Sequence, residues 1–200
     1  MLLLVFGSSA AGKTFALDEL RRRNLDAAIH DFDEIGVPAG ADRGWRHRAN
    51  EEWIGRALDY QADGRDAVIA GQTPFGEMLA SPSAPRLEAI SGCLIDCADD
   101  TLAARLRARG PDWLARAGAE ITDYLAWAEW LRRHAADPTW EQHVITEPTD
   151  VPMRWERWID WRTGDPRWKV ATIDTSDAPV ERVADELSTW IDEQRARSIF

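Results

Sequence analysis

A glycine-rich stretch near the start of the chain has the residue types and spacing of a loop that binds phosphate groups. It reads GSSAAGKT and fits the pattern G-x-x-x-x-G-K-[ST]. Gly7 and Gly12 permit backbone conformations that a side chain would resist, so the N–H groups between them can turn inward and surround an anion. Lys13 would bridge the β- and γ-phosphates of a nucleoside triphosphate, and the hydroxyl of Thr14 would coordinate Mg²⁺. The whole loop is predicted to bind the nucleotide: Gly7, Ser8, Ser9, Ala10, Ala11, Gly12, Lys13 and Thr14.

Two carboxylates follow the second apolar run of the sequence. Asp31 and Asp33 stand two residues apart in HDFDEIG. If the chain stays extended, both point to the same side, at the carboxyl end of a strand where α/β sheets bind ligands. One could hold the water shell of a metal ion, and the other could accept the proton of an attacking hydroxyl. The alternative is a helix N-cap followed by solvated acids.

The third apolar run ends without an acid. Many nucleoside triphosphatases finish this strand with an Asp that supports Mg²⁺, but here the run DAVIA continues into Gly71 and Gln72. The metal-supporting task therefore falls to Asp31, and the absence weakens an interpretation as a motor or a switch. Gln72 could orient water or bind a substrate, and the sequence leaves both open.

The elements that must position these residues follow from apolar patterning. Continuous apolar runs predict buried strands at residues 2–6, 27–30, 67–70, 93–97 and within 168–176. Helical spacing predicts helices at residues 13–23, 46–62, 99–110, 112–136 and 179–195, with Phe15, Leu17 and Leu20 facing inward in the first. Residues 142–146 read as extended and residues 154–161 as helical. The alternation of strand and helix predicts an α/β fold in three layers, with a parallel five-stranded sheet between helices.

Length and composition indicate one globular domain, residues 1–200, with 44% hydrophobic residues. Residues 109–164 are the least sheet-like, and we expect them to form a helical lid or acceptor-binding insertion over the ligand edge. The net charge of -11 disfavours nucleic acid as a partner. The apolar run Met1–Phe6 is too short for a signal peptide or a membrane span, so we expect a cytoplasmic protein without membrane contact. Cys93 and Cys97 are expected to be reduced.

These motifs together resemble a known family. The loop GSSAAGKT, the acidic turn DFD and a glycine after the third strand are similar to the small P-loop kinases of the shikimate kinase and gluconate kinase type. The loop and the acidic turn also resemble chloramphenicol phosphotransferase. KVATIDTS followed by APVERVADEL resembles the terminal strand and helix of that group. The resemblance spans residues 1–110 and 165–195 and implies a P-loop NTPase fold that uses ATP and Mg²⁺.

The resemblance also implies residue roles. It places Asp31 near Mg²⁺ and Asp33 at the acceptor hydroxyl as catalytic base. RLRARGPDW matches the helix that leads into a mobile lid, so Arg105 resembles the residue that packs on adenine. Arg109 resembles the catalytic lid arginine that meets the transferred phosphate beside Lys13, and Arg116 is a rival for that role. The loop after the last strand, with Thr175, touches the adenine in this family.

The acceptor side is less defined. The chain contains 11 Trp, which we expect to serve mostly for packing, although one or two could line a pocket for a bulky acceptor. The segment GQTPFGEML lies at the expected acceptor edge, so the candidate substrate contacts beside Asp33 are Gln72, Thr73 and Glu77.

The sequence thus favours an ATP-dependent kinase that transfers the γ-phosphoryl group to a hydroxyl of a small molecule, such as an antibiotic or a secondary metabolite. A nucleoside or nucleotide kinase is the second hypothesis. A nucleotide-dependent regulatory module, or a toxin-like kinase acting on a cell-wall precursor, is the third. The identity of the acceptor, the choice between ATP and GTP, and the choice between monomer and homodimer stay open.

Overall fold

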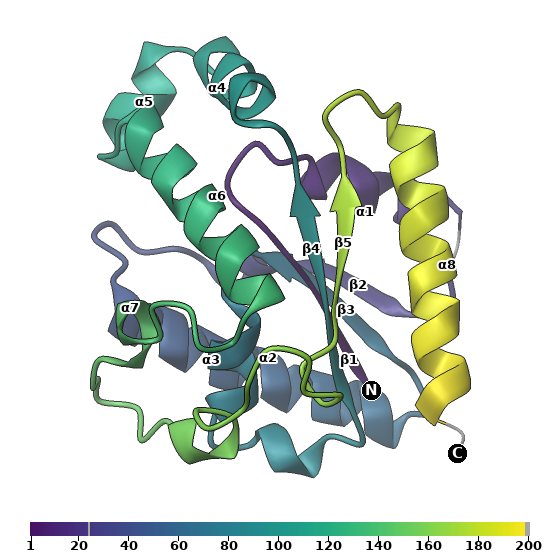
Figure 1. Ribbon diagram of the computed structural model, residues 1–200. Helices are drawn as coiled ribbons and strands as arrows, with labels where there is room; N and C mark the ends of the chain where they lie inside the picture. Colours follow the sequence, from purple (N-terminus) through teal and green to yellow (C-terminus); the bar gives the residue numbers. More distant parts are fainter. Residues whose placement is uncertain (24, 199–200) are drawn as a thin grey trace.

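The computed structural model describes residues 1–23 and 25–198. Its sheet has five parallel strands in the order β2-β3-β1-β4-β5 (Figure 1). The strands are β1 (Leu2–Phe6), β2 (Ala28–Asp31), β3 (Ala67–Gly71), β4 (Ile90–Asp96) and β5 (Val170–Asp174). All five overlap the predicted apolar runs, although β4 begins three residues before its predicted start and ends before Cys97. This confirms the α/β class and the parallel sheet.

Helices connect and cover these strands. The α-helices are α1 (Lys13–Arg22), α2 (Arg43–Ala62), α3 (Phe75–Ala80), α4 (Asp99–Ala108), α5 (Pro111–Ala117), α6 (Ile121–Ala136), α7 (His143–Thr146) and α8 (Val180–Ser198). Short 3₁₀ helices are η1 (Phe32–Ile35), η2 (Ala84–Arg86) and η3 (Trp155–Arg157). Within the described residues, none of these helices combines the length and the apolar composition needed to cross a bilayer.

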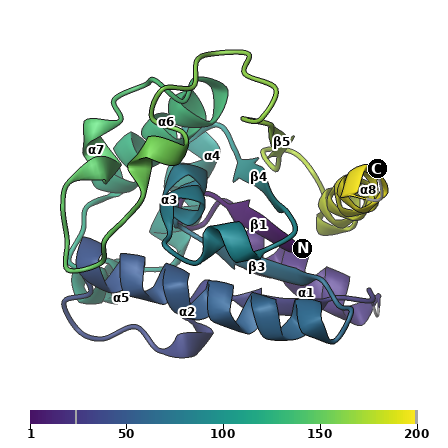
Figure 2. The ribbon, with the colours of Figure 1, turned by 90° about the horizontal axis from the view of Figure 1, so that it is seen from below.

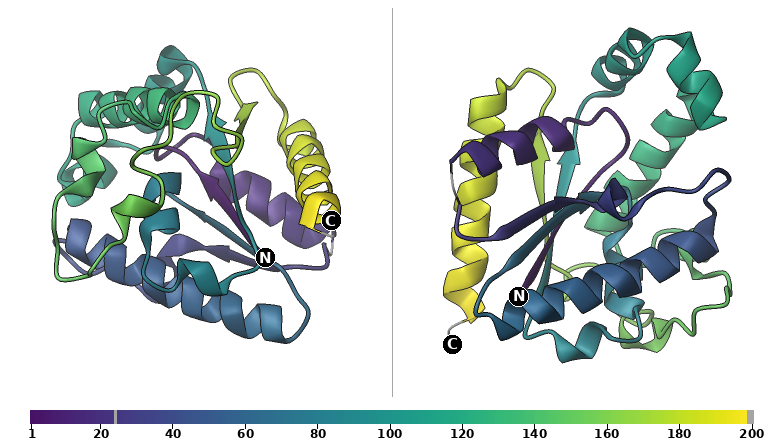
Figure 3. Two further views of the ribbon diagram at one scale, coloured as in Figure 1. Left: turned by 60° about the horizontal axis from the view of Figure 1, so that its bottom comes forward. Right: turned by 180° about the vertical axis from the view of Figure 1, so that it is seen from behind.

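The helices form a layer on each face of the sheet. One face packs against α1 and α8, which cross each other in the right panel of Figure 3. The other face packs against α2, α3 and α6 (Figure 2). Strands buried on both faces must be apolar throughout, and every residue of β1 is buried. The three-layer α/β/α architecture is therefore as predicted.

The first helix departs from its expected orientation in one residue. The side chains of Leu17 and Leu20 are buried against the sheet, but Phe15 is 72% exposed. Successive helical residues are rotated by about 100°. Ala16, which is fully buried, faces the sheet instead, so its neighbour Phe15 points out of the core. The prediction of an inward Phe15 was wrong.

Residues 137–168, the tryptophan-rich segment between α6 and β5, differ from both sequence predictions made for them. Residues 142–146, expected to be extended, contain α7, and residues 154–161, expected to be helical, contain only η3. Side-chain bonds fix this irregular path. The indole of Trp158 donates to the carbonyl of Gly76 at 2.8 Å, and the guanidinium of Arg157 donates to the carbonyls of Leu79, Ser81 and Pro82. Tertiary contacts with α3 and the turn after it thus override the helical pattern.

The register of the sheet places the glycine-rich loop between two strand ends. Phe6 at the end of β1 pairs with Gly71 of β3 on one side and with Leu94 of β4 on the other. β3 and β2 lie on one side of β1, and β4 and β5 lie on the other. In open parallel sheets, ligands bind at the carboxyl end of the strand where the strand order reverses in this way.

Candidate active site

The glycine-rich loop connects β1 to α1. Two of its positions require glycine for steric reasons. A Cβ atom at Gly7 would collide with the carbonyl oxygen of Ile95 on the neighbouring strand. Gly12 has φ +110°, in the left-handed region that side chains avoid, and Ala10 has φ 65°. Backbone of this kind at a helix N-terminus binds anions.

Lys13 lies across this loop. Its Nζ donates to the carbonyl of Gly7 at 2.9 Å and to that of Ser8 at 2.8 Å. Burial lowers the pKa of Lys13 to about 8, although the charges of Asp31 and Asp33 act in the opposite direction. The ammonium group therefore shares one electrostatic environment with both predicted carboxylates.

The two carboxylates are positioned by a helix cap instead of by strand alternation. β2 ends at Asp31, whose Oδ1 accepts from the backbone N–H of Asp33 at 3.1 Å. The carboxylate of Glu34 in turn accepts from the N–H of Asp31 at 3.0 Å, which completes a capping box. The extended conformation thus stops at Asp31, which is the N-cap of η1. This is the alternative that the sequence left open.

Asp33 is an exposed residue that lines the cleft, and its carboxyl group has a raised pKa. Partial desolvation raises this pKa above the ordinary value, and the negative charge of Asp31 raises it further. Lys13 acts against both. A carboxylate with a raised pKa holds a proton more readily, as a general base must.

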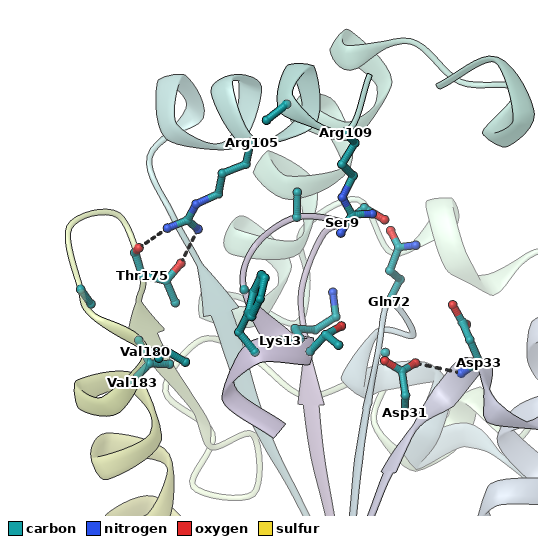
Figure 4. Close-up of a pocket in the computed structure, with 17 residues that line it drawn as sticks. Ser9, Lys13, Asp31, Asp33, Gln72, Arg105, Arg109, Thr175, Val180 and Val183 are labelled. Atoms are coloured by element: carbon teal, nitrogen blue, oxygen red, sulfur yellow. Dashed lines mark hydrogen bonds between the residues drawn. The ribbon is translucent and has the colours of Figure 1, made fainter. Parts of the chain in front are cut away.

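Most of the predicted site residues line one cleft of about 620 Å³ (Figure 4). Those that line it are Ser9, Ala10, Gly12, Lys13, Thr14, Asp31, Asp33, Gln72, Arg105, Arg109 and Thr175. The predicted residues that do not line it are Gly7, Ser8, Ala11, Thr73 and Glu77. The hydroxyl of Ser8 donates instead to the carbonyl of Tyr124, which ties the loop to α6.

Arg105 in α4 and Arg109, which directly follows α4, have different partners. Arg105 donates to the hydroxyl of Thr175 at 2.9 Å and to its carbonyl at 2.6 Å. Arg109 points into the cleft from the end of α4 on the side of Gln72 (Figure 4). Its guanidinium lies 4.5 Å from the ring centre of Trp113. The rival Arg116, an exposed residue of α5, does not line the cleft.

Thr73 and Glu77 do not line the cleft but belong to a buried polar cluster. Thr73 donates to Asn50 at 2.9 Å. The carboxylate of Glu77 is fully buried and accepts two bonds from Arg46, at 2.7 and 2.6 Å. Burial opposes this charge, but Arg46 and His47 outweigh it and lower the pKa of Glu77 to about 2. Sequence reasoning missed Arg46, because its partner lies on another helix and no local pattern joins them.

The tryptophans serve mainly for packing. Those buried in the core are Trp53, Trp130, Trp158, Trp168 and Trp190. Trp127 stacks on Trp130 with ring centres 5.0 Å apart, and the guanidinium of Arg46 lies 5.7 Å from the ring centre of Trp127. In the described part of the chain, no tryptophan lines the cleft.

Comparison with known proteins supports the fold. The sequence matches no protein-family model and no curated protein. Among solved structures it resembles an unliganded sugar kinase of Janibacter sp. (TM-score 0.56, 12% identity, 96% of this chain and 94% of that one). It also resembles the YorR protein of Bacillus subtilis in complex with phosphorylated GDP (TM-score 0.55, 9% identity, 98% of both chains). A shikimate kinase of Aquifex aeolicus also matches (TM-score 0.46, 13% identity, 98% and 99%). The predicted resemblance to P-loop kinases is confirmed at the level of the fold.

Proposed function

We propose that this protein is an ATP-dependent phosphotransferase that moves the γ-phosphoryl group of ATP to a hydroxyl of a small molecule. The observation that carries the proposal is the meeting of Lys13 and Asp33 in one cleft. A phosphate-binding loop with its lysine lies beside a carboxylate whose pKa is raised. A fold shared with a protein named as a sugar kinase supports the same conclusion.

The donor half of the site fits Mg²⁺ together with a triphosphate. Thr14 and Asp31, whose hydroxyl and carboxylate are oxygen ligands of the kind that Mg²⁺ takes, line the same cleft. Few protein oxygens suffice for Mg²⁺, which usually retains waters and binds the phosphates as well. When bound, Mg²⁺ would neutralise charge on the β- and γ-phosphates. The loop N–H groups and Lys13 would hold and orient those phosphates.

The transfer step is a displacement at the γ-phosphorus. The acceptor oxygen forms a bond to this phosphorus, and the bond to the β–γ bridging oxygen breaks, so that ADP leaves. The hydroxyl proton passes to the carboxylate of Asp33. Arg109, which points into the cleft, would balance charge on the transferred group. Gln72 lies at the same end and would contact the acceptor.

An acceptor screen tests this function. Sugars, sugar acids, hydroxylated antibiotics, nucleosides and nucleotides would be incubated with ATP and Mg²⁺, following ADP release and the mass of the product. We expect a phosphorylated product that Asp33→Asn abolishes while ATP binding is retained. Asp63→Asn is the matched control, because Asp63 is an exposed acid outside the cleft. Unchanged turnover in Asp33→Asn would contradict the assignment of the base.

The same screen separates the other candidate functions. A product from a nucleoside or nucleotide alone would favour a nucleotide kinase, a function to which the YorR complex with phosphorylated GDP lends weight. Slow ATP hydrolysis that rises with a protein partner, without any phosphorylated acceptor, would favour a regulatory module.

A further inference from the structure

Arg109 points into the cleft with its hydrogen-bond donors unused. Burial is the main reason for the lowered pKa of Lys13, and the positive charge of Arg109 acts in the same direction, so the two cations lie near each other. Within residues 1–23 and 25–198, no oxygen accepts a hydrogen bond from the guanidinium of Arg109. The guanidinium of Arg105, by contrast, donates to Thr175 and Ala11. The N–H groups of Arg109 are therefore available to the oxygens of a phosphate in the cleft.

An aromatic ring holds this arginine instead of an oxygen acceptor. The Cζ atom of Arg109 lies 4.5 Å from the ring centre of Trp113 in α5. The electrons of an aromatic ring attract a guanidinium ion through its charge. A carboxylate partner would also hold the side chain in place, but it would compete with phosphate for the same N–H groups. The ring of Trp113 therefore restrains the guanidinium without supplying a rival acceptor.

Trp113 is connected to the glycine-rich loop through α6. Its ring contacts that of Tyr124, with ring centres 5.6 Å apart. The backbone carbonyl of Tyr124 accepts from the hydroxyl of Ser8 at 3.1 Å. Ala10 of the same loop and Trp113 both pack against one small apolar cluster, which consists of Cys97, Leu102, Leu106 and Ala128. A continuous series of contacts thus joins the loop to the ring that holds the arginine.

We propose that Trp113 positions Arg109 in the cleft so that its guanidinium binds the γ-phosphate of ATP. The proposal rests on the proposed function, because it requires a triphosphate on the glycine-rich loop. It adds Trp113 as a positioning residue, which acts through Arg109 and does not itself contact the nucleotide.

The physical basis of this role is conformational entropy. A long arginine side chain that moves freely in solvent loses rotamer freedom when it binds a phosphate, and this loss weakens binding. The contact with Trp113 restricts the side chain of Arg109 before the nucleotide arrives. Less freedom then remains to be lost on binding, so the interaction with the γ-phosphate is stronger.

Calorimetric titration with ATP and with ADP, each with Mg²⁺, tests the proposal, because only ATP carries the γ-phosphate. Arg109→Met should weaken ATP binding by about tenfold, and Trp113→Leu should weaken it by about fivefold. Both variants should bind ADP within about twofold of wild type. Trp113→Phe keeps an aromatic ring and should bind ATP within about twofold of wild type.

Two controls separate positioning from a general effect on the fold. In a protein that already carries Arg109→Met, Trp113→Leu should weaken ATP binding by no more than about twofold further, since the arginine through which it acts is gone. Trp161→Leu is the matched control. The guanidinium of Arg167 lies 4.3 Å from the ring centre of Trp161, and neither residue lines the cleft, so ATP binding should be unchanged.

The outcomes distinguish this proposal from the function on which it rests. Wild-type affinity for ATP in Trp113→Leu would overturn it, and so would equal losses of ATP and ADP binding, which indicate a structural role. An equal effect of Trp113→Leu with and without Arg109→Met would also overturn it. In each case the phosphotransferase assignment stands if Lys13→Ala abolishes ATP binding. If Lys13→Ala binds ATP as tightly as wild type, the triphosphate is not on this loop, and both proposals fall.

Discussion

Phe32 packs so closely on Gly71 that a Cβ atom at Gly71 would lie 2.6 Å from the Cβ of Phe32. This contact joins the end of β3 to the start of η1, the turn that carries Asp33. It also gives a physical reason for the missing acid at the end of the third strand. An aspartate side chain has no room at this position, because Phe32 occupies it.

Replacement of Gly71 by alanine should therefore affect the acidic turn more than the phosphate loop. Gly71→Ala must displace Phe32 and, with it, Asp33. We expect phosphoryl transfer to fall by about tenfold or more, with ATP affinity within about threefold of wild type. Steady-state kinetics and calorimetry measure the two effects. Gly55→Ala is the control, since a Cβ there meets nothing within 4 Å; equal turnover in both variants would contradict the positioning role.

The carboxyl group of Asp33 should titrate above the ordinary aspartate range in the nucleotide-free protein. Burial and the charge of Asp31 raise its pKa, and Lys13 lowers it. Asp31→Asn should therefore lower the pKa of Asp33, and Lys13→Ala should raise it. Carbon-detected NMR titration of the side-chain carboxyl measures all three proteins. Identical values in the three would show that these charges do not meet in one site.

Nucleotide binding should weaken as the pH rises above about 8. Lys13 must be charged to bind phosphates, and burial lowers its pKa to about 8 in the free protein. Below this pH the lysine already carries its proton, whereas above it binding must take up about one proton. Calorimetry in buffers of different ionisation enthalpy measures the uptake. Lys13→Arg keeps its charge in this pH range, so its residual nucleotide binding should show no proton uptake. The same proton uptake in Lys13→Arg would assign the proton to another group.

The pair of Arg46 and Glu77 should matter for stability. Arg46→Met removes both short bonds to the buried carboxylate of Glu77 and leaves it only the longer contacts with His47 at 3.5 Å and Thr73 at 3.4 Å, which should lower the free energy of unfolding by about 3 kcal/mol in urea denaturation. Arg182→Met breaks an exposed pair with Glu186 and should cost no more than about 1 kcal/mol. Equal losses in the two variants would contradict a buried charge at Glu77.

The pH dependence of the free energy of unfolding tests the lowered pKa of Glu77. Its folded pKa of about 2 lies below the value of about 4.3 in an unfolded chain, so its contribution is complete above the unfolded value. That contribution should fade as the pH falls toward 2. Glu77→Gln should lack this part of the acid dependence, measured by urea denaturation across the acid range. An unchanged acid profile in Glu77→Gln would contradict the lowered pKa.

The sequence predicts what local patterns encode. The glycine-rich loop is eight consecutive residues, and the strands are continuous apolar runs, so both could be placed without a structure. Contacts between distant segments could not. The bidentate bond from Arg46 to Glu77 joins α2 to α3, and Trp158 reaches back to α3 from the far end of the tryptophan-rich segment. Phe15 was misplaced because helical spacing alone does not fix which face meets the sheet.

The candidate site was predictable to the same extent. Asp31 and Asp33 were found from their spacing and their place after a strand, and both line the cleft. Their geometry was left open between an extended strand and a helix N-cap, and the capping box closed by Glu34 shows that Asp31 is the N-cap. Thr73 and Glu77 come after β3, at the edge where substrate contacts were predicted, but they do not line the cleft. Their buried hydrogen-bond partners lie in α2.

The central claim is that Asp33 receives the proton of a hydroxyl while the γ-phosphoryl group moves to that oxygen. Transfer of labelled γ-phosphate from ATP to an organic acceptor, in wild type and in Asp33→Asn, tests it most directly. We expect label on the acceptor with wild type, loss of that label by at least about a hundredfold in Asp33→Asn, and equal ATP binding by both. Label transferred by Asp33→Asn at the wild-type rate, or recovered only as inorganic phosphate with every acceptor, would contradict it.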